Sequence, residues 1–175
     1  MQRIKFVCII WVFLIFTYCN KSFEPAEESF ICNSEDNPIN LIFKYGVTAN
    51  NILNTFDCTY QKDMVVDPPV IIKLKLTEEE LDSVFVIMQS IDFFEYPDTF
   101  FVNVQSGTIG VTMPSSKYYF YVEKDSISKK LFWNDSIVNP DDSAEKLRRL
   151  NKHIMDLIKS KEDYAKLSNP RGSYQ

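Results

Sequence analysis

The sequence predicts an α+β fold, with a mostly antiparallel twisted sheet and two helices packed on one face. Several short segments alternate apolar and polar residues, which is the period expected of half-buried strands. Two longer segments place apolar residues at helical spacing. The turn signals between consecutive strands are short, which favours antiparallel pairing. Two helices on one face would bury both apolar stripes and leave the opposite face of the sheet partly exposed to solvent.

The chain begins with an export-type segment. Arg3 and Lys5 make the first residues positive. The thirteen residues 6–18 are apolar except for Thr17. A helix of that length reaches roughly 20 Å, which is short of the ~30 Å hydrocarbon core of a bilayer. A charged start followed by a short apolar run is typical of a signal peptide, so we assign residues 1–18 to one.

The end of this segment allows three interpretations. Ordinary signal peptidase requires small residues before the cut, and Tyr18 is not small. An uncleaved segment would act as a short membrane anchor. In the third interpretation Cys19 becomes the lipid-bearing N-terminus of a bacterial lipoprotein, because residues 15–19 match a lipobox apart from Tyr18. We favour lipid attachment at Cys19, where each buried CH₂ of the acyl chains adds about 0.8 kcal/mol to membrane affinity.

Residues 19–40 are expected to form a flexible tether between this lipid and a single domain over residues 41–175. The segment is polar and acidic, and Pro25 and Pro38 interrupt it. The rest of the chain is long enough for one domain with its own core.

The mature chain is acidic. Without residues 1–18 it loses Arg3 and Lys5, and its formal charge changes from −5 to −7. Binding to nucleic acid or to an anionic membrane surface through charge requires clustered Lys and Arg, so we expect neither. The expected membrane contact is the N-terminal lipid alone.

Cys32 and Cys58 are the two cysteines beyond the apolar segment and its end. In the oxidising compartment that export implies, they can form a disulfide, whose loop of about 26 residues would add about 3 kcal/mol to stability. The alternative is two free buried thiols, because spacing says nothing of the distance between the Cα atoms. A zinc site is not expected, since the single histidine, His153, is distant in the sequence.

Three strands and a helix are expected in the first half of the domain. The strands cover residues 41–45, 52–64 and 70–76. A break at residues 67–69, with two prolines, precedes the last of them. The helix covers residues 78–90, because Thr77 and Glu80 have the spacing of a capping box before an apolar stripe.

The second half of the domain is expected to be mostly β. Strands are predicted over residues 99–105, 107–113, 117–124 and 130–134. Turn signals separate them at residues 106–107 and 114–116. A second helix then extends to Ile158, with Asp142 as its N-cap. The chain closes from Tyr164 as an irregular tail.

The sequence has no recognisable motif that pairs a nucleophilic side chain with a general base, so we expect no catalytic residue and no cofactor. On the second helix, His153 is interpreted as a surface or boundary residue. The four glycines of the chain make a phosphate loop or a dinucleotide turn improbable. The acid pairs Asp57/Asp63 and Asp141/Asp142 are explained by a solvent-facing strand and a helix cap.

Aromatic residues are the most informative excess in the domain. In the strand "KYYFYVEK", Tyr119 and Tyr121 point to one side and alternate with Tyr118 and Phe120. If the second pair faces the helices, the first pair lies on the open face of the sheet, near Phe101. Tyrosine packs against a partner while its hydroxyl stays hydrated, so we predict an interaction surface of Phe101, Tyr119 and Tyr121. The alternative is that aromatic residues simply favour strands.

Three stretches of the chain carry a family resemblance. They are Cys19-Asn20-Lys21 after the apolar segment, the run from "LNTFDCTYQKDM" to "IIKLKLTEEELDSVFVIMQSIDFFEYPD", and the ending "DYAKLSNPRGSY". In these stretches, over residues 19–28, 53–98 and 160–175, the chain resembles small lipoproteins of the Bacteroidetes type, with Ser168 where they tend to have proline. The resemblance implies an envelope location and a compact α+β domain. That group has no established activity, so the resemblance transfers no catalytic residue.

Together these features predict a lipid-anchored domain of the bacterial cell envelope that acts as a binding module without catalytic activity. The expected partner is an envelope protein or another macromolecule. Two alternatives stay open at this point. One is a carboxylate-dependent hydrolase acting on envelope polymers, and the other is a purely structural envelope component.

Overall fold

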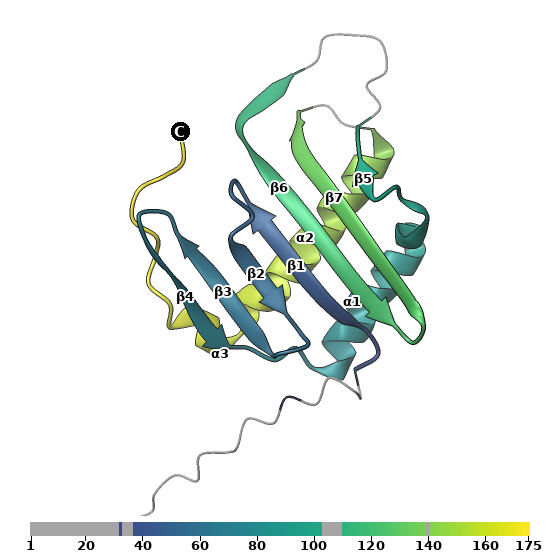
Figure 1. The fold of residues 1–175 in the computed structure, drawn as a ribbon, viewed down its shortest axis with the longest axis horizontal. Coiled ribbons are helices and arrows are strands. Elements are labelled where there is room, and N and C mark those ends of the chain that lie inside the picture. Colours follow the sequence, from purple (N-terminus) through teal and green to yellow (C-terminus); the bar gives the residue numbers. More distant parts are fainter. Residues whose placement is uncertain (1–31, 33–36, 103–109, 139–140) are drawn as a thin grey trace, which may run out of the picture. The chain divides into compact units, whose positions relative to one another are not determined.

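The computed structural model describes residues 32, 37–102, 110–138 and 141–175 (Figure 1). The predicted signal peptide, the lipid-attachment residue Cys19 and most of the predicted tether lie outside the described residues. The folded unit described below lies within Ile31–Gln175.

A seven-stranded sheet forms the centre of the fold. Its strands are β1 (Asn40–Gly46), β2 (Asn51–Asn54), β3 (Thr59–Met64), β4 (Asp67–Lys73), β5 (Thr99–Phe100), β6 (Val111–Lys124) and β7 (Ile127–Ile137). In space their order is β4-β3-β2-β1-β6-β7-β5. Neighbouring strands run antiparallel, except that β5 is parallel to β7.

The helices cover one face of this sheet (Figure 1). They are α1 (Glu78–Ser90), the short 3-10 helix η1 (Phe93–Glu95), α2 (Asp142–Ser160) and α3 (Glu162–Ala165). In Figure 1, α1 and α2 pass behind the central strands, and no helix of the described residues lies in front of them. The predicted α+β class is confirmed.

The core lies between the helices and the sheet. Alternate strand residues meet two helical stripes there, and the buried side chains are Leu41, Phe43, Leu53, Tyr60, Phe120, Val122, Leu131 and Trp133 from the sheet, with Leu81, Val84, Met88, Leu147, Leu150, Ile154 and Ile158 from the helices. Burial of one such apolar side chain contributes about 1.5–3 kcal/mol. The packing of these two layers is the main source of stability in the fold.

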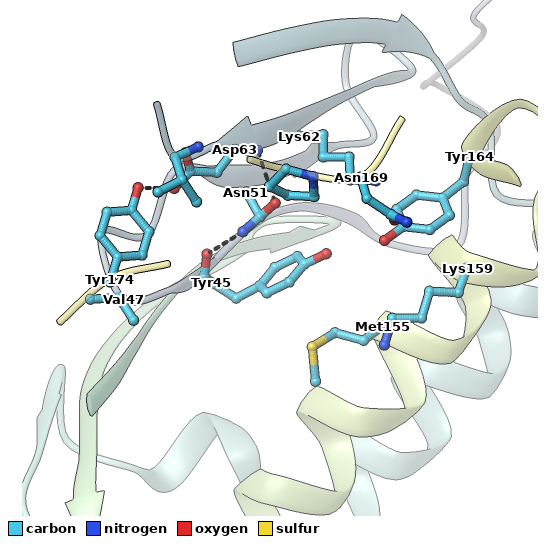
Figure 2. A pocket seen from close by; sticks show the side chains of 12 residues that line it. Tyr45, Val47, Asn51, Lys62, Asp63, Met155, Lys159, Tyr164, Asn169 and Tyr174 are labelled. Atoms are coloured by element: carbon cyan, nitrogen blue, oxygen red, sulfur yellow. Dashed lines mark hydrogen bonds between the residues drawn. The ribbon is translucent and has the colours of Figure 1, made fainter. Parts of the chain in front are cut away.

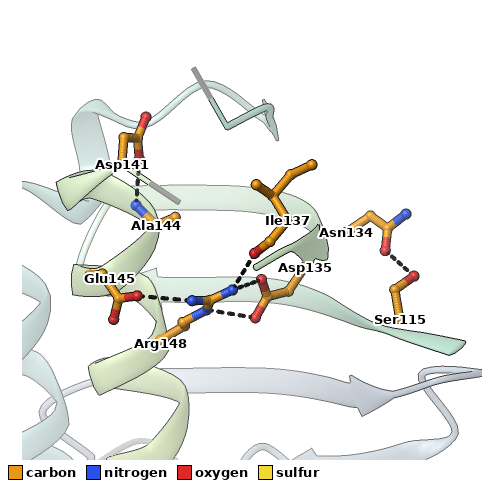
Figure 3. A network of polar contacts seen from close by, with 8 residues as sticks. All are labelled: Ser115, Asn134, Asp135, Ile137, Asp141, Ala144, Glu145 and Arg148. Atoms are coloured by element: carbon orange, nitrogen blue, oxygen red, sulfur yellow. Dashed lines mark hydrogen bonds and ion pairs between the residues drawn. The ribbon is translucent and has the colours of Figure 1, made fainter. Parts of the chain in front are cut away.

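Capping residues set the start of both long helices. As predicted, the Thr77 hydroxyl accepts the Glu80 amide at 3.2 Å, and the Glu80 carboxylate accepts the Thr77 amide at 2.8 Å. The prediction for α2 was wrong by one residue. Asp141, not Asp142, is the N-cap, and its carboxylate accepts the Ala144 amide at 2.9 Å (Figure 3). Two adjacent aspartates have the same capping chemistry, so local sequence does not distinguish them.

Residues 52–64 form a hairpin rather than one strand. β2 and β3 pair antiparallel around a turn, in which Cys58 has a φ of 48°. The buried Thr55 hydroxyl accepts the Leu41 amide at 2.8 Å and so holds the turn against β1. The alternation of polar and apolar residues continues through the turn, which is why it suggested a single strand.

The turn expected at residues 114–116 lies inside β6. Val111 pairs with Ile137 of β7, and the next pair in the ladder is Ser116 with Asp135. The additional β6 residues between these pairs form an irregularity of the bulge type. Proline and serine signal a turn locally, but pairing with β7 resumes at Ser116, the last residue of the expected turn.

Part of the strand expected over residues 99–105 is confirmed. Thr99 and Phe100 form β5 beside β7. Residues 103–109, which include the expected turn at 106–107, lie outside the described residues.

The described end of the expected tether is attached to the domain. Cys32 and Cys58 form a disulfide, with their Cα atoms 5.8 Å apart. Ile39 is buried, and the Pro38 carbonyl accepts a hydrogen bond from the Lys124 ammonium at 3.0 Å. The folded domain therefore begins before the boundary that we expected at residue 41, because these contacts bind the preceding segment to the sheet.

Arg148 joins α2 to the end of β7 (Figure 3). Its guanidinium donates to both carboxylate oxygens of Asp135, at 2.9 and 2.6 Å, and to the Ile137 carbonyl at 2.6 Å. Its third nitrogen donates to Glu145 on the same helix at 2.8 Å. A bidentate guanidinium–carboxylate pair fixes orientation as well as distance. This network therefore helps to set the position of the helix layer on the sheet.

The C-terminal tail packs beside the β4 edge of the sheet (Figure 1). Arg171 forms a backbone bridge with Val65 and an ion pair with Asp67. The Tyr174 hydroxyl donates to the Asp63 carboxylate at 2.6 Å. The predicted irregular tail is thus a fixed part of the domain.

Candidate functional site

The face of the sheet opposite the helices contains the predicted interaction surface. Tyr118 and Phe120 point to the helices and pack in or against the core. Tyr119 and Tyr121 point to the other face, and each is partly exposed. The predicted orientation of the four aromatic residues in β6 is therefore correct, because side chains alternate along a strand.

Strand register places Tyr119 in a row of side chains across the sheet. Its neighbours are Lys44 of β1 on one side and Phe132 of β7 on the other. The row continues through Ile52 of β2 and Gln61 of β3 to Ile71 of β4. Phe132 is 38% exposed and Ile71 is 64% exposed, so this row presents apolar surface to solvent.

A second row passes through Tyr121. Register places Ile42 of β1 beside it on one side and Lys130 of β7 on the other. The Tyr121 ring also stacks on Phe56, with the ring centroids 6.1 Å apart. Its hydroxyl donates a hydrogen bond to the Glu123 carboxylate, and this bond raises the pKa of Tyr121. The hydrogen bond holds the ring in a fixed orientation on the open face.

Lysine ammonium groups accompany both tyrosines. The Lys44 Nζ lies 5.5 Å from the centroid of the Tyr119 ring, and the Lys130 Nζ lies 5.8 Å from that of Tyr121. These distances are within the range of cation–π attraction. We define the aromatic–lysine patch as Ile42, Lys44, Tyr119, Tyr121, Lys130 and Phe132.

Phe101 lies at one side of this patch. It is 79% exposed, and with Thr99, Phe132 and Ile137 it lines a small hollow of about 220 Å³. Phe132 therefore connects Phe101 to Tyr119, and the structure brings these two predicted residues to one region. Phe132 was not among the predicted residues, although its place between Leu131 and Trp133, which are both buried, puts it on the open face by alternation.

The acidic pairs do not converge on a site. The Asp57 carboxylate accepts the Asn54 amide group at 2.7 Å, within the β2–β3 turn. The Asp63 carboxylate accepts the hydroxyls of Thr48 and Tyr174 at 2.7 and 2.6 Å. Burial alone would raise the pKa of Asp63, but these bonds and the Val65 amide outweigh it and lower the pKa. Asp57 and Asp63 are thus each bound by side chains of the fold itself.

His153 connects the two long helices. Its Nε2 lies 2.8 Å from the Ser83 hydroxyl of α1, a residue that the sequence analysis did not single out. The same hydroxyl donates to the Glu80 carbonyl at 2.6 Å, so it accepts from the histidine. A hydroxyl used in this way links two helices, in agreement with the boundary role expected of His153.

Two further features are absent from the described residues. No group of three His, Cys, Asp or Glu side chains there has a geometry suited to a metal ion. None of the described helices combines the length and apolar character needed to cross a membrane.

Comparisons with known proteins add no family to these observations. No protein-family model, no curated protein and no solved structure matches the chain. Its function is therefore inferred from its own residues.

Proposed function

We propose that this protein is a lipid-anchored binding module of the bacterial cell envelope, which recognises an acidic protein partner through the open face of its sheet. The aromatic–lysine patch is the observation that carries this proposal. It combines aromatic rings, two of them amphipathic tyrosines, with lysines on the face that no described helix covers. Tyrosine in particular is enriched at the centres of protein interfaces, where its ring packs against a partner while its hydroxyl forms hydrogen bonds.

Strand propensity alone does not account for this pattern. The exposed side of a half-buried antiparallel sheet usually carries polar residues, which alternate with the apolar residues of the core. Here Tyr119 and Phe132 stand side by side on the open face, and Ile52 continues their row beyond Lys44. Burial of this apolar surface against a partner would lower the free energy of the complex.

Charge favours an acidic partner. The protein has a formal charge of −5, yet Lys44, Lys73, Lys117 and Lys130 share the open face according to the strand registers. Lysines at the rim of an apolar patch increase the rate at which an acidic surface binds. They also disfavour a partner with a basic surface, which gives the interface selectivity.

The double variant Tyr119→Ser with Tyr121→Ser tests the role of the face. Both side chains are partly exposed and outside the core, so the melting temperature should change little. Capture of acidic proteins from envelope extracts should fall by about tenfold or more, as expected for loss of interface aromatics. A matched control is Val86→Ser, which removes a 61% exposed apolar side chain from α1.

Two results would count against this proposal. Capture of the same proteins by the double variant at the wild-type level would show that the tyrosines are not contacts. A drop in melting temperature by tens of degrees would show that both tyrosines serve the fold.

The lipid anchor is tested separately. Radioactive palmitate should label the wild-type protein and the Cys8→Ser variant, but not Cys19→Ser, because only Cys19 follows the apolar segment at the position of a lipobox cysteine. Equal labelling of Cys19→Ser and wild type would end the lipoprotein proposal. That result would leave the binding face untouched, since it concerns a different part of the chain.

A further inference from the structure

A pocket of about 320 Å³ lies on the helix side of the sheet, where β1 and β3 meet the end of α2, α3 and the C-terminal tail (Figure 2). The side chains that matter for its chemistry are Tyr45, Lys62, Met155, Lys159, Tyr164 and Pro170. These residues come from distant parts of the sequence. They are also separated from the aromatic–lysine patch by the thickness of the sheet.

Lys62 is a buried cation at this pocket. The residue is only 6% exposed. Its ammonium donates one hydrogen bond, to the Ser168 carbonyl at 2.9 Å, and lies 5.0 Å from the centroid of the Tyr164 ring. An ammonium group has three donors, so its donor capacity is not exhausted by this contact. Removal from water also lowers the pKa of Lys62.

The surroundings do not supply a counter-charge for Lys62. Among the residues that the structure describes, its ammonium forms no ion pair with a carboxylate. Asp63, also in the pocket lining, is engaged by Thr48 and Tyr174 and by the Val65 amide. A buried charge is costly unless it is paired, so an anion at this position would stabilise the ammonium.

The rest of the pocket can hold the body of such an anion. Lys159 of α2 belongs to the same lining, and Figure 2 shows its side chain on the side of the pocket that α2 forms, with Met155. Tyr45 points its ring and hydroxyl into the space, and that hydroxyl is fixed by Tyr60 at 2.7 Å. The Tyr164 ring and Met155 supply flat and apolar surface. The lining thus combines apolar and aromatic surface with charged and amide groups, and convergent polar groups beside apolar surface are a feature of small-ligand sites.

We propose that this pocket binds a small organic anion, with its acidic group at the ammonium groups of Lys62 and Lys159 and a ring-shaped body against Tyr45, Met155 and Tyr164. The site is independent of the partner-binding face, because the two use opposite sides of the sheet. The protein would thus carry a second ligand, of a different chemical class from the partner.

Benzoate is a suitable probe, because it places one carboxylate on a flat ring. Binding to the mature full-length chain can be followed by ligand-observed NMR, with benzamide as the neutral isostere and inorganic phosphate as an anion without a ring. Benzoate should bind with a Kd below about 10 mM, and benzamide at least about tenfold more weakly, since a charged hydrogen bond is lost.

Three variants locate the site. Lys62→Met keeps the apolar stem and should weaken benzoate binding by about tenfold or more. Lys159→Met removes the second charge without affecting the bond to Ser168, and should weaken it several-fold. Lys75→Met is the matched control, because it removes an equal charge from an exposed position outside the pocket lining and outside the aromatic–lysine patch, and it should bind as wild type does.

The stability of Lys62→Met separates a ligand-binding lysine from a structural one. Replacement of an unpaired buried ammonium by a methionine should leave the melting temperature unchanged or raise it. A lower melting temperature together with wild-type benzoate binding would show that Lys62 only fixes the tail at Ser168, and would overturn the proposal.

Other outcomes would overturn the proposal as well. One is that benzoate and benzamide bind equally well, and another is that the protein binds phosphate but not benzoate. A third is that no probe binds at about 10 mM, a Kd that corresponds to less than 3 kcal/mol of binding free energy. Each of these leaves the test of the partner-binding face unaffected.

Discussion

Reduction of the Cys32–Cys58 disulfide should lower the stability of the domain by about 3.5 kcal/mol at 25 °C. The bridge joins residues with a sequence separation of 26. In the chain-entropy account, closing a loop of that length removes conformations from the unfolded chain, and the figure follows from the loop length alone. For a domain of this size, 1 kcal/mol corresponds to about 2–4 °C, so the melting temperature should fall by roughly 7–14 °C.

Urea unfolding of the mature chain, with and without reductant, measures this difference. Trp133 is fully buried, and the other tryptophan lies in the predicted signal peptide, so tryptophan fluorescence reports the exposure of one core residue. The double variant Cys32→Ala with Cys58→Ala is the control, because its unfolding should not respond to reductant.

Equal midpoints for the oxidised and reduced chains would refute the entropic reasoning. A smaller difference together with a changed urea slope would have another meaning. It would show that the reduced unfolded chain stays partly compact, because the slope reports the surface exposed on unfolding.

Three further predictions concern stability. Thr77→Ala removes the capping box of α1 and should cost about 1 kcal/mol in urea unfolding, and an unchanged midpoint would contradict that role. Arg148→Met should cost about 3 kcal/mol or more, because it leaves the largely buried Asp135 carboxylate without its partner, whereas a loss below about 1 kcal/mol would mean that water replaces the guanidinium. Burial raises the pKa of Tyr45 to about 12 from an ordinary value of 10.0, so between these pH values the unfolded chain binds fewer protons than the folded one. The contribution of Tyr45 to the free energy of unfolding should therefore be fully present below pH 10 and fall by about 1.4 kcal/mol per pH unit between pH 10 and about 12. Melting temperatures recorded against pH should fall less steeply for Tyr45→Phe than for the wild type.

Local patterns in the sequence predicted much of the secondary structure. The capping box at Thr77 and the apolar stripe after it defined α1, because both lie within a few residues of each other. The alternation in β6 correctly divided its aromatic residues between the core and the open face. Where two local signals were equivalent, as for Asp141 and Asp142, the prediction was wrong by one residue.

Strand boundaries that depend on a neighbouring strand were predicted less accurately. The alternation over residues 52–64 gives no indication of the reversal between β2 and β3, which is held by the Thr55 hydroxyl and β1. Residues 114–116 have the composition of a turn, yet pairing with β7 carries the strand past them. In both segments, contacts with a neighbouring strand outweigh the local preference.

The sequence by itself determined the class of the fold, the faces of its strands and helices, and the position of the predicted interaction residues in β6. Only the tertiary structure decided which residues join them, such as Phe132 of β7 and Lys44 of β1 on the two sides of Tyr119. It also decided the pocket at Lys62, whose lining includes α2, α3 and the C-terminal tail. The physical reason is that periodicity and capping act over a few residues, whereas a patch or a pocket is made by packing between segments far apart in the chain.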